Sequence, residues 1–459
     1  MKSSRANIRA RVHKIPRVRF EPDQRLTSYA GLVIFQHLFQ RLDLKNRMRR
    51  CFDHLDSETH AIFETAAVVT ILVVHLLLGF RRLRGLDFYR HDPLVARVVG
   101  LKKLPDVSTV SRALATLDER SVQEAQTLSR DLVLERLRAE QFARLTLDFD
   151  GSVQSTTGHA EGTAVGYNKL KKGARSYYPL FCTVAQTGQF FDMHHRSGNV
   201  HDSNGASTFM RQCFDYVSWP GTTLEGRMDS AFFDQKVLAA LDEVGVEFTC
   251  SVPFERFPEF KRVIESRRVW ETIDGDWSFF DANWKPKSWD TRYRFLCLRQ
   301  RVARQQKGPL QMDLFQPKSF EYEYKVIVTN KTGTAKAALE FHNGRGTQEK
   351  IFGEAKQHAA LDLIATRTLH GNQMFTIASM LAHNLTRELQ MQALPRDRST
   401  LPKRPALWQF DQLGTIRQQI VHQAGRLSRP QGELTLTISD NPVVREQITK
   451  YLPASALAA

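Results

Sequence analysis

Apolar and polar positions divide the chain into a helical part, up to about residue 140, and an α/β part that follows. In residues 107–117, apolar side chains at 107, 110, 114 and 117 recur at the spacing of one helical face. Asp106 or Ser108 can cap the start of this helix. Its other face carries Ser108, Thr109 and Arg112, polar groups that suit the recognition helix of a helix-turn-helix motif. A plain amphipathic helix in a bundle has the same pattern, so both interpretations stay open.

Residues 66–80 form a long apolar stretch, broken only by Thr70 and His75 and followed by several arginines. A helix that spans a bilayer needs about 20 apolar residues. The stretch is shorter than that, and a histidine inside it adds to the cost of insertion. We therefore predict a buried core helix and no membrane partner.

The α/β part opens with a strand in which apolar residues at 145, 147 and 149 alternate with Thr146, Asp148 and Asp150. This alternation places the two carboxylates on one face of the strand, near its end. A strand-strand-strand-helix-strand-helix-strand order then predicts an α/β fold that begins with a meander. Further strands are predicted at 179–184, 189–194, 223–229 and 246–252, helices at 203–217, 231–244, 347–358 and 374–391, and a β-rich aromatic region at 262–330.

Charge adds a partner to this picture. The chain has 65 Lys and Arg against 49 Asp and Glu, a formal net charge of +16. This excess favours an anionic partner, with nucleic acid first. No acidic residue precedes Glu21, so we interpret residues 1–25 as a basic arm that can follow DNA phosphates, with an organellar transit peptide as the alternative. The five cysteines form no CxxC pair, which argues against a zinc ribbon and favours a reducing, cytoplasmic compartment.

Three carboxylates are candidates for metal-dependent phosphodiester chemistry, which needs oxygen ligands for hard cations. Asp150 ends the first strand and Asp229 ends the fourth, and adjacent strand ends can bring them together. Glu349 is the candidate third ligand, because Arg345, Glu349 and Lys356 form one helical stripe with residue 352. An ordinary ion-pair ladder has the same spacing, and isolated aspartates at strand ends are common caps.

A family resemblance connects these weak signals. The segments LDFDGS (147–152), RMDSAFFD (227–234) and GRGTQEKIFGEAK (344–356) together resemble the DDE transposases of bacterial insertion sequences. Arg345, Glu349 and Lys356 match one subgroup's signature of Tyr, two residues, Arg, three residues, Glu, six residues and Lys. His342 stands where the signature has Tyr, so either the neighbouring Phe341 supplies the ring or that contact is changed. The resemblance covers about residues 20–395.

The resemblance implies an RNase H-like mixed sheet flanked by helices, interrupted by a β-rich insertion, with a helical N-terminal domain. We divide the chain accordingly into a basic arm (1–25), a helical end-recognition domain (26–140), the first part of the catalytic core (141–258), the insertion (259–335), the completion of the core with the Glu helix (336–395), and a C-terminal tail (396–459).

The resemblance further implies that Asp150, Asp229 and Glu349 bind two Mg²⁺ or Mn²⁺ ions, with Asp148 as the alternative first ligand. The implied reaction is cleavage at the ends of a DNA element, followed by attack of the freed 3′-OH on target DNA, of the cut-and-paste type. Two alternatives remain open: an RNase H-like nuclease without strand transfer, and a domesticated DNA-binding protein without catalysis.

The predicted partners are double-stranded DNA, both terminal inverted repeats and target, and a second copy of the chain in the DNA complex, at the bacterial nucleoid. A sliding clamp is a further candidate, because residues 311–315 resemble the short peptide that docks on it. The predicted DNA contacts are Arg345, Lys356, Lys169, Lys171, Lys172, Arg175, Arg112 and Trp289, and the clamp-docking residues are Gln311, Met312, Leu314 and Phe315.

Overall fold

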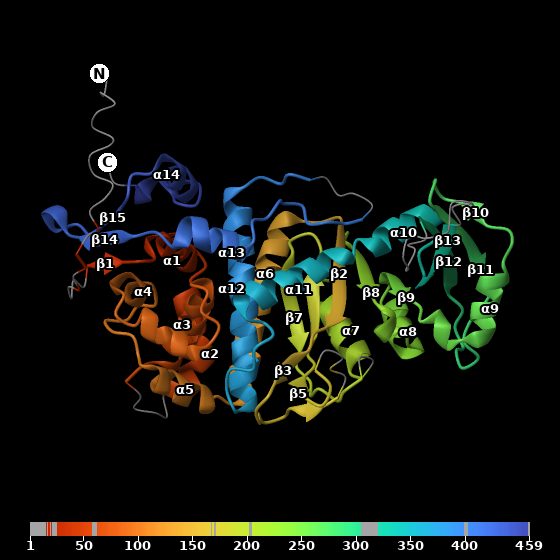
Figure 1. Cartoon of the computed structure of the whole chain (residues 1–459), viewed down its shortest axis with the longest axis horizontal. Coiled ribbons are helices and arrows are strands. Elements are labelled where there is room, and N and C mark those ends of the chain that lie inside the picture. The colour runs from red at the N-terminus through yellow and green to blue at the C-terminus, as the bar shows by residue number, and fades with distance from the viewer. Residues whose placement is uncertain are drawn as a thin grey trace, which may run out of the picture.

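The computed structural model describes residues 25–56, 62–166, 168, 171–201, 204–303, 320–398 and 403–457, together with residues 15, 17, 18 and 20. In the view of Figure 1 the N-terminal helices and the C-terminal strands lie on the left, a large sheet occupies the middle, and the insertion lies on the right. The long helix α12 (Leu369–Ala393) stands between the N-terminal helices and the sheet.

The sheet is mixed and contains nine strands in the order β10-β11-β12-β13-β9-β8-β2-β6-β7. Strands β2, β6 and β7 form an antiparallel meander, and β8 and β9 continue the sheet parallel to β2. This is the RNase H-like arrangement, so the predicted fold class is confirmed. The bounds are β2 (Arg144–Gly151), β6 (Leu180–Val184), β7 (Gln189–His194), β8 (Thr223–Met228) and β9 (Glu247–Ser251).

Helices cover both faces of this sheet, which explains why residues 145–149 are all buried. The apolar face of β2 packs on α6 (Glu119–Glu140), α7 (Ala206–Tyr216) and α8 (Gln235–Glu243), where Phe149 meets Phe209 and Phe214. The other face, which carries Thr146 and Asp148, is polar. It lies under α10 (Ala335–Asn343) and α11 (Gly346–Ala359).

The insertion extends the same sheet. Strand β13 pairs antiparallel with β9, with Ile327 opposite Ser251, so the insertion forms a continuation of the core sheet. A helix, α9 (Pro258–Ser266), opens this region, and the β-rich pattern did not predict it. The strands are β10 (Glu271–Thr272), β11 (Trp277–Ala282), β12 (Arg294–Ala303) and β13 (Phe320–Thr329).

The apolar stretch at 66–80 forms α3 (Thr65–Leu77), which is buried along most of its length and packs on α12. His75 is accommodated there because its ring nitrogens lie 2.8 Å from the Tyr89 hydroxyl and 3.1 Å from the Arg82 carbonyl oxygen. Among the residues that the structure describes, no helix has both the length and the apolar character to cross a membrane. The other N-terminal helices are α1 (Val33–Arg41), α2 (Leu44–Asp56), α4 (Pro93–Val98) and α5 (Val107–Ala115).

The C-terminal segment returns to the N-terminal helices. Strand β1 (Leu26–Thr27) pairs with β14 (Gly425–Ser428), and β15 (Thr435–Ile438) completes a small sheet. Residues near both ends of the chain therefore share one sheet, on the left of Figure 1. The remaining elements are α13 (Leu413–Ile416), α14 (Pro442–Thr449), and the strands β3 (Gln154–Thr156), β4 (Ala164–Val165) and β5 (Arg175–Tyr177) of a third sheet.

Candidate active site

Strand register brings two of the three candidate carboxylates to the same edge of the sheet. Phe149 of β2 pairs with Met228 of the parallel strand β8, so Asp150 and Asp229 occupy the next positions on neighbouring strands. Both residues are partly exposed. The Asp229 carboxylate also accepts a hydrogen bond from the Ala231 amide at 2.9 Å, which starts the short helix after β8.

The third carboxylate comes from α11, which crosses this edge. Gln348 attaches the first turn of α11 to β2, because its Nε2 donates to the Asp148 carbonyl oxygen at 2.9 Å. Glu349 is the next residue, and its side chain is 69% exposed, so packing does not hold its rotamer. Arg345 connects two of the carboxylates: its Nη1 lies 3.5 Å from Asp150 Oδ2, and its Nη2 lies 3.7 Å from Glu349 Oε1.

The rest of the helical stripe is divided between packing and solvent. Phe352 is buried and its ring lies 5.5 Å from that of Phe181 and 5.6 Å from that of Phe190, which anchors α11 on the sheet. Lys356 is partly exposed, with its Nζ 5.9 Å from the Phe352 ring centre. An ion pair between Arg345 and Glu349 exists, as the ladder interpretation expects, but Arg345 also contacts a second element.

Asp148, the alternative first ligand, lies beneath the site. Its two oxygens are 2.5 Å from Arg227 Nε and 2.6 Å from Arg227 Nη2, and both side chains are buried. Burial raises the pKa of Asp148 above its usual value, although the Arg227 guanidinium acts in the opposite direction. Because both oxygens are engaged by a buried arginine, the geometry favours Asp150 as the first ligand.

His342, at the signature's Tyr position, faces the sheet. Its Nε2 lies 2.9 Å from the Ser251 hydroxyl and its Nδ1 lies 3.0 Å from the Thr249 hydroxyl. Burial, followed by the charges of Lys325, Arg345 and Arg227, lowers the pKa of His342 well below its usual value. A neutral, buried imidazole therefore occupies this position.

Sequence reasoning missed Lys325 at the same edge. Because β13 runs antiparallel to β9 and Ile327 is opposite Ser251, the last residue of β9, Lys325 lies where β9 ends. Its Nζ donates to Asn343 Oδ1 at 2.8 Å, next to the start of α11. Burial, together with the charge of Arg345, lowers the pKa of Lys325 to about 8. Only the register of β13 on β9 reveals this placement, and no sequence signal marked it.

The predicted DNA contacts other than Arg345 and Lys356 differ in where the structure places them. Lys171, Lys172 and Arg112 are exposed, the last on the polar face of α5. Arg175 is turned toward the protein, where its Nε donates to the Thr163 hydroxyl at 3.0 Å. Trp289 is 6% exposed and packs 4.6 Å from the Phe233 ring, so it is a core residue and we omit it from the DNA contacts. Lys169 and the clamp-docking residues Gln311, Met312, Leu314 and Phe315 lie outside the described residues.

The donors at this edge suit hard divalent ions such as Mg²⁺ or Mn²⁺, which bind carboxylate oxygens. Within the described part of the chain, no three His, Cys, Asp or Glu side chains already approach one another closely enough to hold an ion. The guanidinium of Arg345 supplies positive charge between Asp150 and Glu349 instead. The residues therefore fit a divalent-metal site in chemistry and placement, with Glu349 exposed enough to rotate toward the aspartates.

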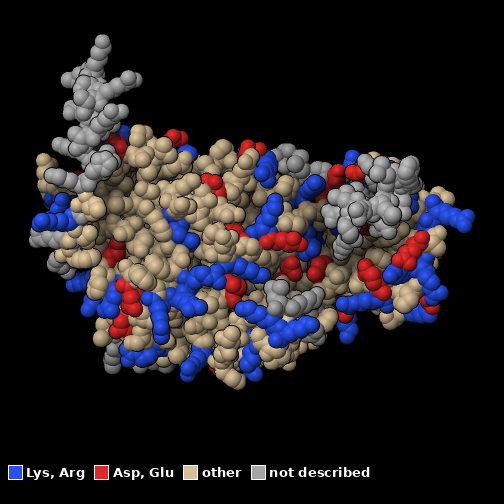
Figure 2. Space-filling model, in the orientation of Figure 1, with Lys and Arg blue, Asp and Glu red and all other residues tan. Residues whose placement is uncertain are grey.

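Basic side chains lie around the edge of the sheet. Figure 2 shows Lys and Arg side chains spread across this face of the molecule, with a smaller acidic group near its middle, where α11 passes in front of the sheet in Figure 1. Carboxylates surrounded by cations suit a polyanionic substrate, because the outer charges attract the phosphates that the acidic centre alone would repel.

Comparisons with known proteins identify the family. The family model for the transposase DDE domain, group 1, matches residues 12–456. Among solved structures, the chain is similar to a piggyBac transposase synaptic complex with hairpin DNA at 12% identity and a TM-score of 0.43, over 93% of this chain and 86% of that one. It is also similar to two Mos1 paired-end complexes. The complex with the left transposon end has 9% identity and a TM-score of 0.17, over 34% of this chain and 52% of that one. The complex with Mn has 12% identity and a TM-score of 0.17, over 36% and 56%.

No match was found among curated proteins. The family match nevertheless extends over nearly the whole chain, from the basic arm to the C-terminal segment. The chain therefore belongs to the group 1 family of transposase DDE domains, and it is a DNA transposase, an enzyme that cleaves and joins DNA strands.

Proposed function

We propose that Asp150, Asp229 and Glu349 form the centre at which this transposase cuts the ends of its element and joins them to target DNA. The observation that carries this proposal is the position of Arg345, which contacts Asp150 and Glu349 beside the paired ends of β2 and β8. Three chain segments far apart in sequence thus present carboxylates and one guanidinium at a single edge.

Two divalent ions, Mg²⁺ or Mn²⁺, would supply the activation of the attacking oxygen and the stabilisation of the leaving oxygen. Asp150 and Asp229 present their carboxylates from rigid strand ends, whereas Glu349 can adjust from the exposed side of α11. Arg345 can offer its planar fork to a phosphate, because its present contacts at 3.5 and 3.7 Å are longer than a bidentate pair. Lys325 and Lys356 are the proposed partners of flanking phosphates.

Cutting and joining can occur at one such centre, because both are displacements at phosphorus that differ only in the attacking oxygen. Water attacks in cleavage and a DNA 3′-OH attacks in joining. The nuclease alternative is tested by supplying a pre-cut element end with a free 3′-OH and a supercoiled plasmid. We expect joined product; cleavage of intact ends without any joined product would support a nuclease instead.

The site assignment is tested with Asp150→Asn, Asp229→Asn and Glu349→Gln in a cleavage assay on element-end DNA with Mg²⁺ or Mn²⁺. Each variant should lose about 10²–10³-fold in rate, the usual loss when a group that stabilises transition-state charge is removed. DNA binding should survive, since affinity comes mainly from basic contacts with phosphates. Glu340→Gln, on the neighbouring helix α10, is the matched control. Full activity in folded Glu349→Gln would reject the assignment.

We further propose a homodimer on DNA at the bacterial nucleoid, because an element has two ends and each centre acts on one of them. Sedimentation of the protein with end DNA should show two protein chains and two ends in one complex, and a complex with one chain would contradict this. For the sliding clamp, the proposal rests on the sequence of residues 311–315 alone. Calorimetry should show binding that Leu314→Ala/Phe315→Ala abolishes, and equal binding by both proteins would reject it.

A further inference from the structure

Arg227 is a fully buried cation close to the candidate active site. It lies on β8, two residues before Asp229, and its side chain has no exposed surface. An ion in such an environment loses its hydration, so its surroundings must provide strong compensating contacts. A well-packed apolar side chain would fill the same volume without that cost.

The guanidinium makes four directed contacts with three other segments. Two of them are the bonds to Asp148 on β2, at 2.5 and 2.6 Å. Nη1 also donates to the Phe341 carbonyl oxygen at 3.2 Å and to the Lys403 carbonyl oxygen at 2.6 Å. Arg227 therefore connects β8 with β2, with the end of α10, and with the chain at residue 403.

Two of these connections, to Asp148 and to Phe341, lead to members of the proposed centre. Asp148 lies two residues before Asp150 on the same strand. Phe341 lies in the last turn of α10, directly before the junction that carries Arg345 and leads into α11. Gln348 closes the set of contacts, because it binds the carbonyl oxygen of the same Asp148 and immediately precedes Glu349.

Gly344, at the junction of α10 and α11, shows how tightly this arrangement is packed. A Cβ atom on Gly344 would lie 2.1 Å from Arg227 Nη1 and 2.0 Å from the Lys403 carbonyl oxygen. Its φ of −58° is accessible to any residue, so glycine is needed here for space and not for backbone freedom. The turn that leads to Glu349 is therefore built directly around the guanidinium.

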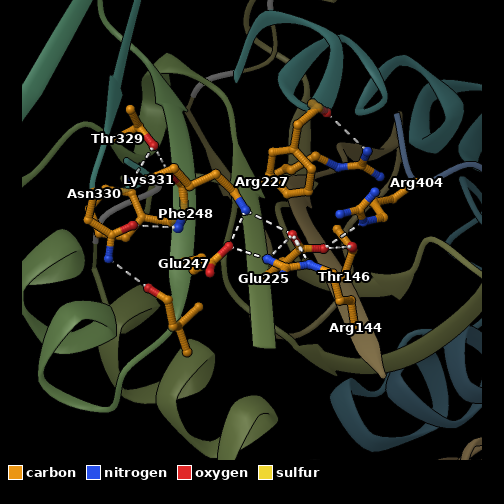
Figure 3. Close-up of polar contacts among 12 residues, drawn as sticks. Arg144, Thr146, Glu225, Arg227, Glu247, Phe248, Thr329, Asn330, Lys331 and Arg404 are labelled. Atoms are coloured by element: carbon orange, nitrogen blue, oxygen red, sulfur yellow. Dashed lines mark hydrogen bonds and ion pairs between the residues drawn. The ribbon is translucent and has the colours of Figure 1, made fainter. Parts of the chain in front are cut away.

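A second buried network on β8 provides a contrast. Glu225 binds Arg144, Lys331 and Arg404, further from the edge (Figure 3). Its contacts join β8 with β2, with the segment after β13 and with the segment at residue 404, and none of the residues that bind Glu225 belongs to α11. Lys331 also lies 4.3 Å from the centre of the Phe341 ring on α10. The network around Arg227 connects with the helix that bears Glu349 through Asp148, whose carbonyl oxygen binds Gln348.

From these contacts we infer that Arg227 is a positioning residue for catalysis, which holds the strands of Asp150 and Asp229 and the helix of Glu349 in the register that the centre requires. This inference rests on the proposed function of Asp150, Asp229 and Glu349. Arg227 touches no substrate; it acts through Asp148 and through the α10–α11 junction. A displacement of about 1 Å in such a centre can cost about 10²-fold in rate.

The test is the neutral pair Asp148→Leu/Arg227→Met, because it removes both charges together and leaves no unpaired buried ion. We expect a folded protein with wild-type affinity for end DNA. We also expect Mn²⁺ binding, measured by electron paramagnetic resonance without DNA, to weaken about tenfold, and kcat for cleavage to fall about 10–100-fold with KM unchanged. Backbone amide hydrogens of residues 341–352 should exchange faster with solvent, because the α10–α11 junction is less tightly held. This measurement needs no metal.

The matched control is Arg130→Met/Asp192→Leu. This pair is also nearly buried and is joined at 2.9 Å, but it connects α6 with β7, at the edge strand furthest from the insertion. It should change the stability of the fold without changing the Mn²⁺ affinity or the amide exchange of residues 341–352. If the Arg227 pair variant does not fold, Gly344→Ala, which pushes on the same guanidinium, is measured in the same way.

The outcomes separate two hypotheses. The positioning role is overturned if the Arg227 pair variant binds Mn²⁺, cleaves DNA and exchanges its backbone amides like the wild type. If the pair variant does not fold, the same result in Gly344→Ala overturns it. Asp150→Asn tests the centre itself: if it binds Mn²⁺ like the wild type, the proposed metal site fails, whatever Arg227 does. If Asp150→Asn abolishes binding and the Arg227 variants do not weaken it, only the positioning role is wrong.

Discussion

Replacing Glu225 with glutamine should lower the free energy of unfolding of the core by about 3–5 kcal/mol, the usual cost of breaking a buried ion pair from one side. Glu225 lies on β8 and has no exposed surface. Its carboxylate lies 2.7 Å from Arg144, 2.8 Å from Lys331 and 3.1 Å from Arg404, and the Thr146 hydroxyl donates to it at 2.9 Å (Figure 3).

Glutamine keeps the size of this side chain but not its charge, so three cations lose a shared carboxylate. Glu247 also contacts Arg144 and Lys331, so in the variant it still neutralises part of the charge of these two cations. We therefore expect the lower end of the range, about 3 kcal/mol.

The loss should depend on pH in a definite direction. Burial alone would raise the pKa of Glu225, but Lys331, Arg144 and Arg404 lower it below the ordinary value of 4.5. Between that lowered pKa and about 4.5, the unfolded chain binds more protons than the folded one, so wild-type stability decreases on acidification. The glutamine variant has no such proton to gain. The difference in free energy of unfolding between the wild type and Glu225→Gln should be complete above pH 4.5. It should disappear as the pH falls through the pKa of Glu225 in the folded protein.

Urea unfolding followed by tryptophan fluorescence measures this difference at neutral pH and along an acid series. Glu243→Gln is the control, because its side chain is 65% exposed and lies 3.7 Å from Arg211, and such surface pairs contribute at most about 1 kcal/mol. The reasoning about this network is refuted if Glu225→Gln lowers the free energy of unfolding no more than Glu243→Gln does at neutral pH. It is also refuted if Glu225→Gln lowers that free energy equally at acid and neutral pH.

Two further predictions concern the edge of the sheet. Lys325→Ala should weaken end-DNA binding and reduce the slope of log affinity against log salt by about 1, whereas Lys336→Ala, at an exposed position, should do neither. Because the pKa of Lys325 is about 8, the DNA affinity of the wild type should fall above pH 8 more than the affinity of Lys325→Arg. Parallel curves of affinity against pH for these two proteins would contradict the assignment. Gly151→Ala should slow cleavage while leaving DNA binding intact, because the new Cβ would lie 2.6 Å from the Tyr178 ring and displace Asp150. Gly275→Ala is the control, since a Cβ there meets nothing within 4 Å. An unchanged cleavage rate in Gly151→Ala would show that the strand end tolerates the shift.

Local patterns predicted individual elements well, both at the site and away from it. The alternation at 145–149 predicted β2, and the apolar spacing at 107–117 predicted α5, whose cap is Asp106 with the Thr109 amide at 2.7 Å. These patterns depend on neighbours within one or two turns, which the sequence lists in order. The sequence analysis does not predict helix α9, because the aromatic, β-rich composition of residues 262–330 outweighs its short helical pattern.

The sequence by itself determined that Asp148 and Asp150 share one face of a strand, that Asp229 ends another, and that Glu349 follows Arg345 by one helical turn. Only the tertiary structure separated the two aspartates of β2, because the partner that engages Asp148 is Arg227 on a different strand. It likewise placed Lys325 at the edge and Trp289 in the core. Periodicity is a property of neighbouring residues, whereas register, burial and ion pairing depend on which distant segments meet, and a single sequence does not state those meetings.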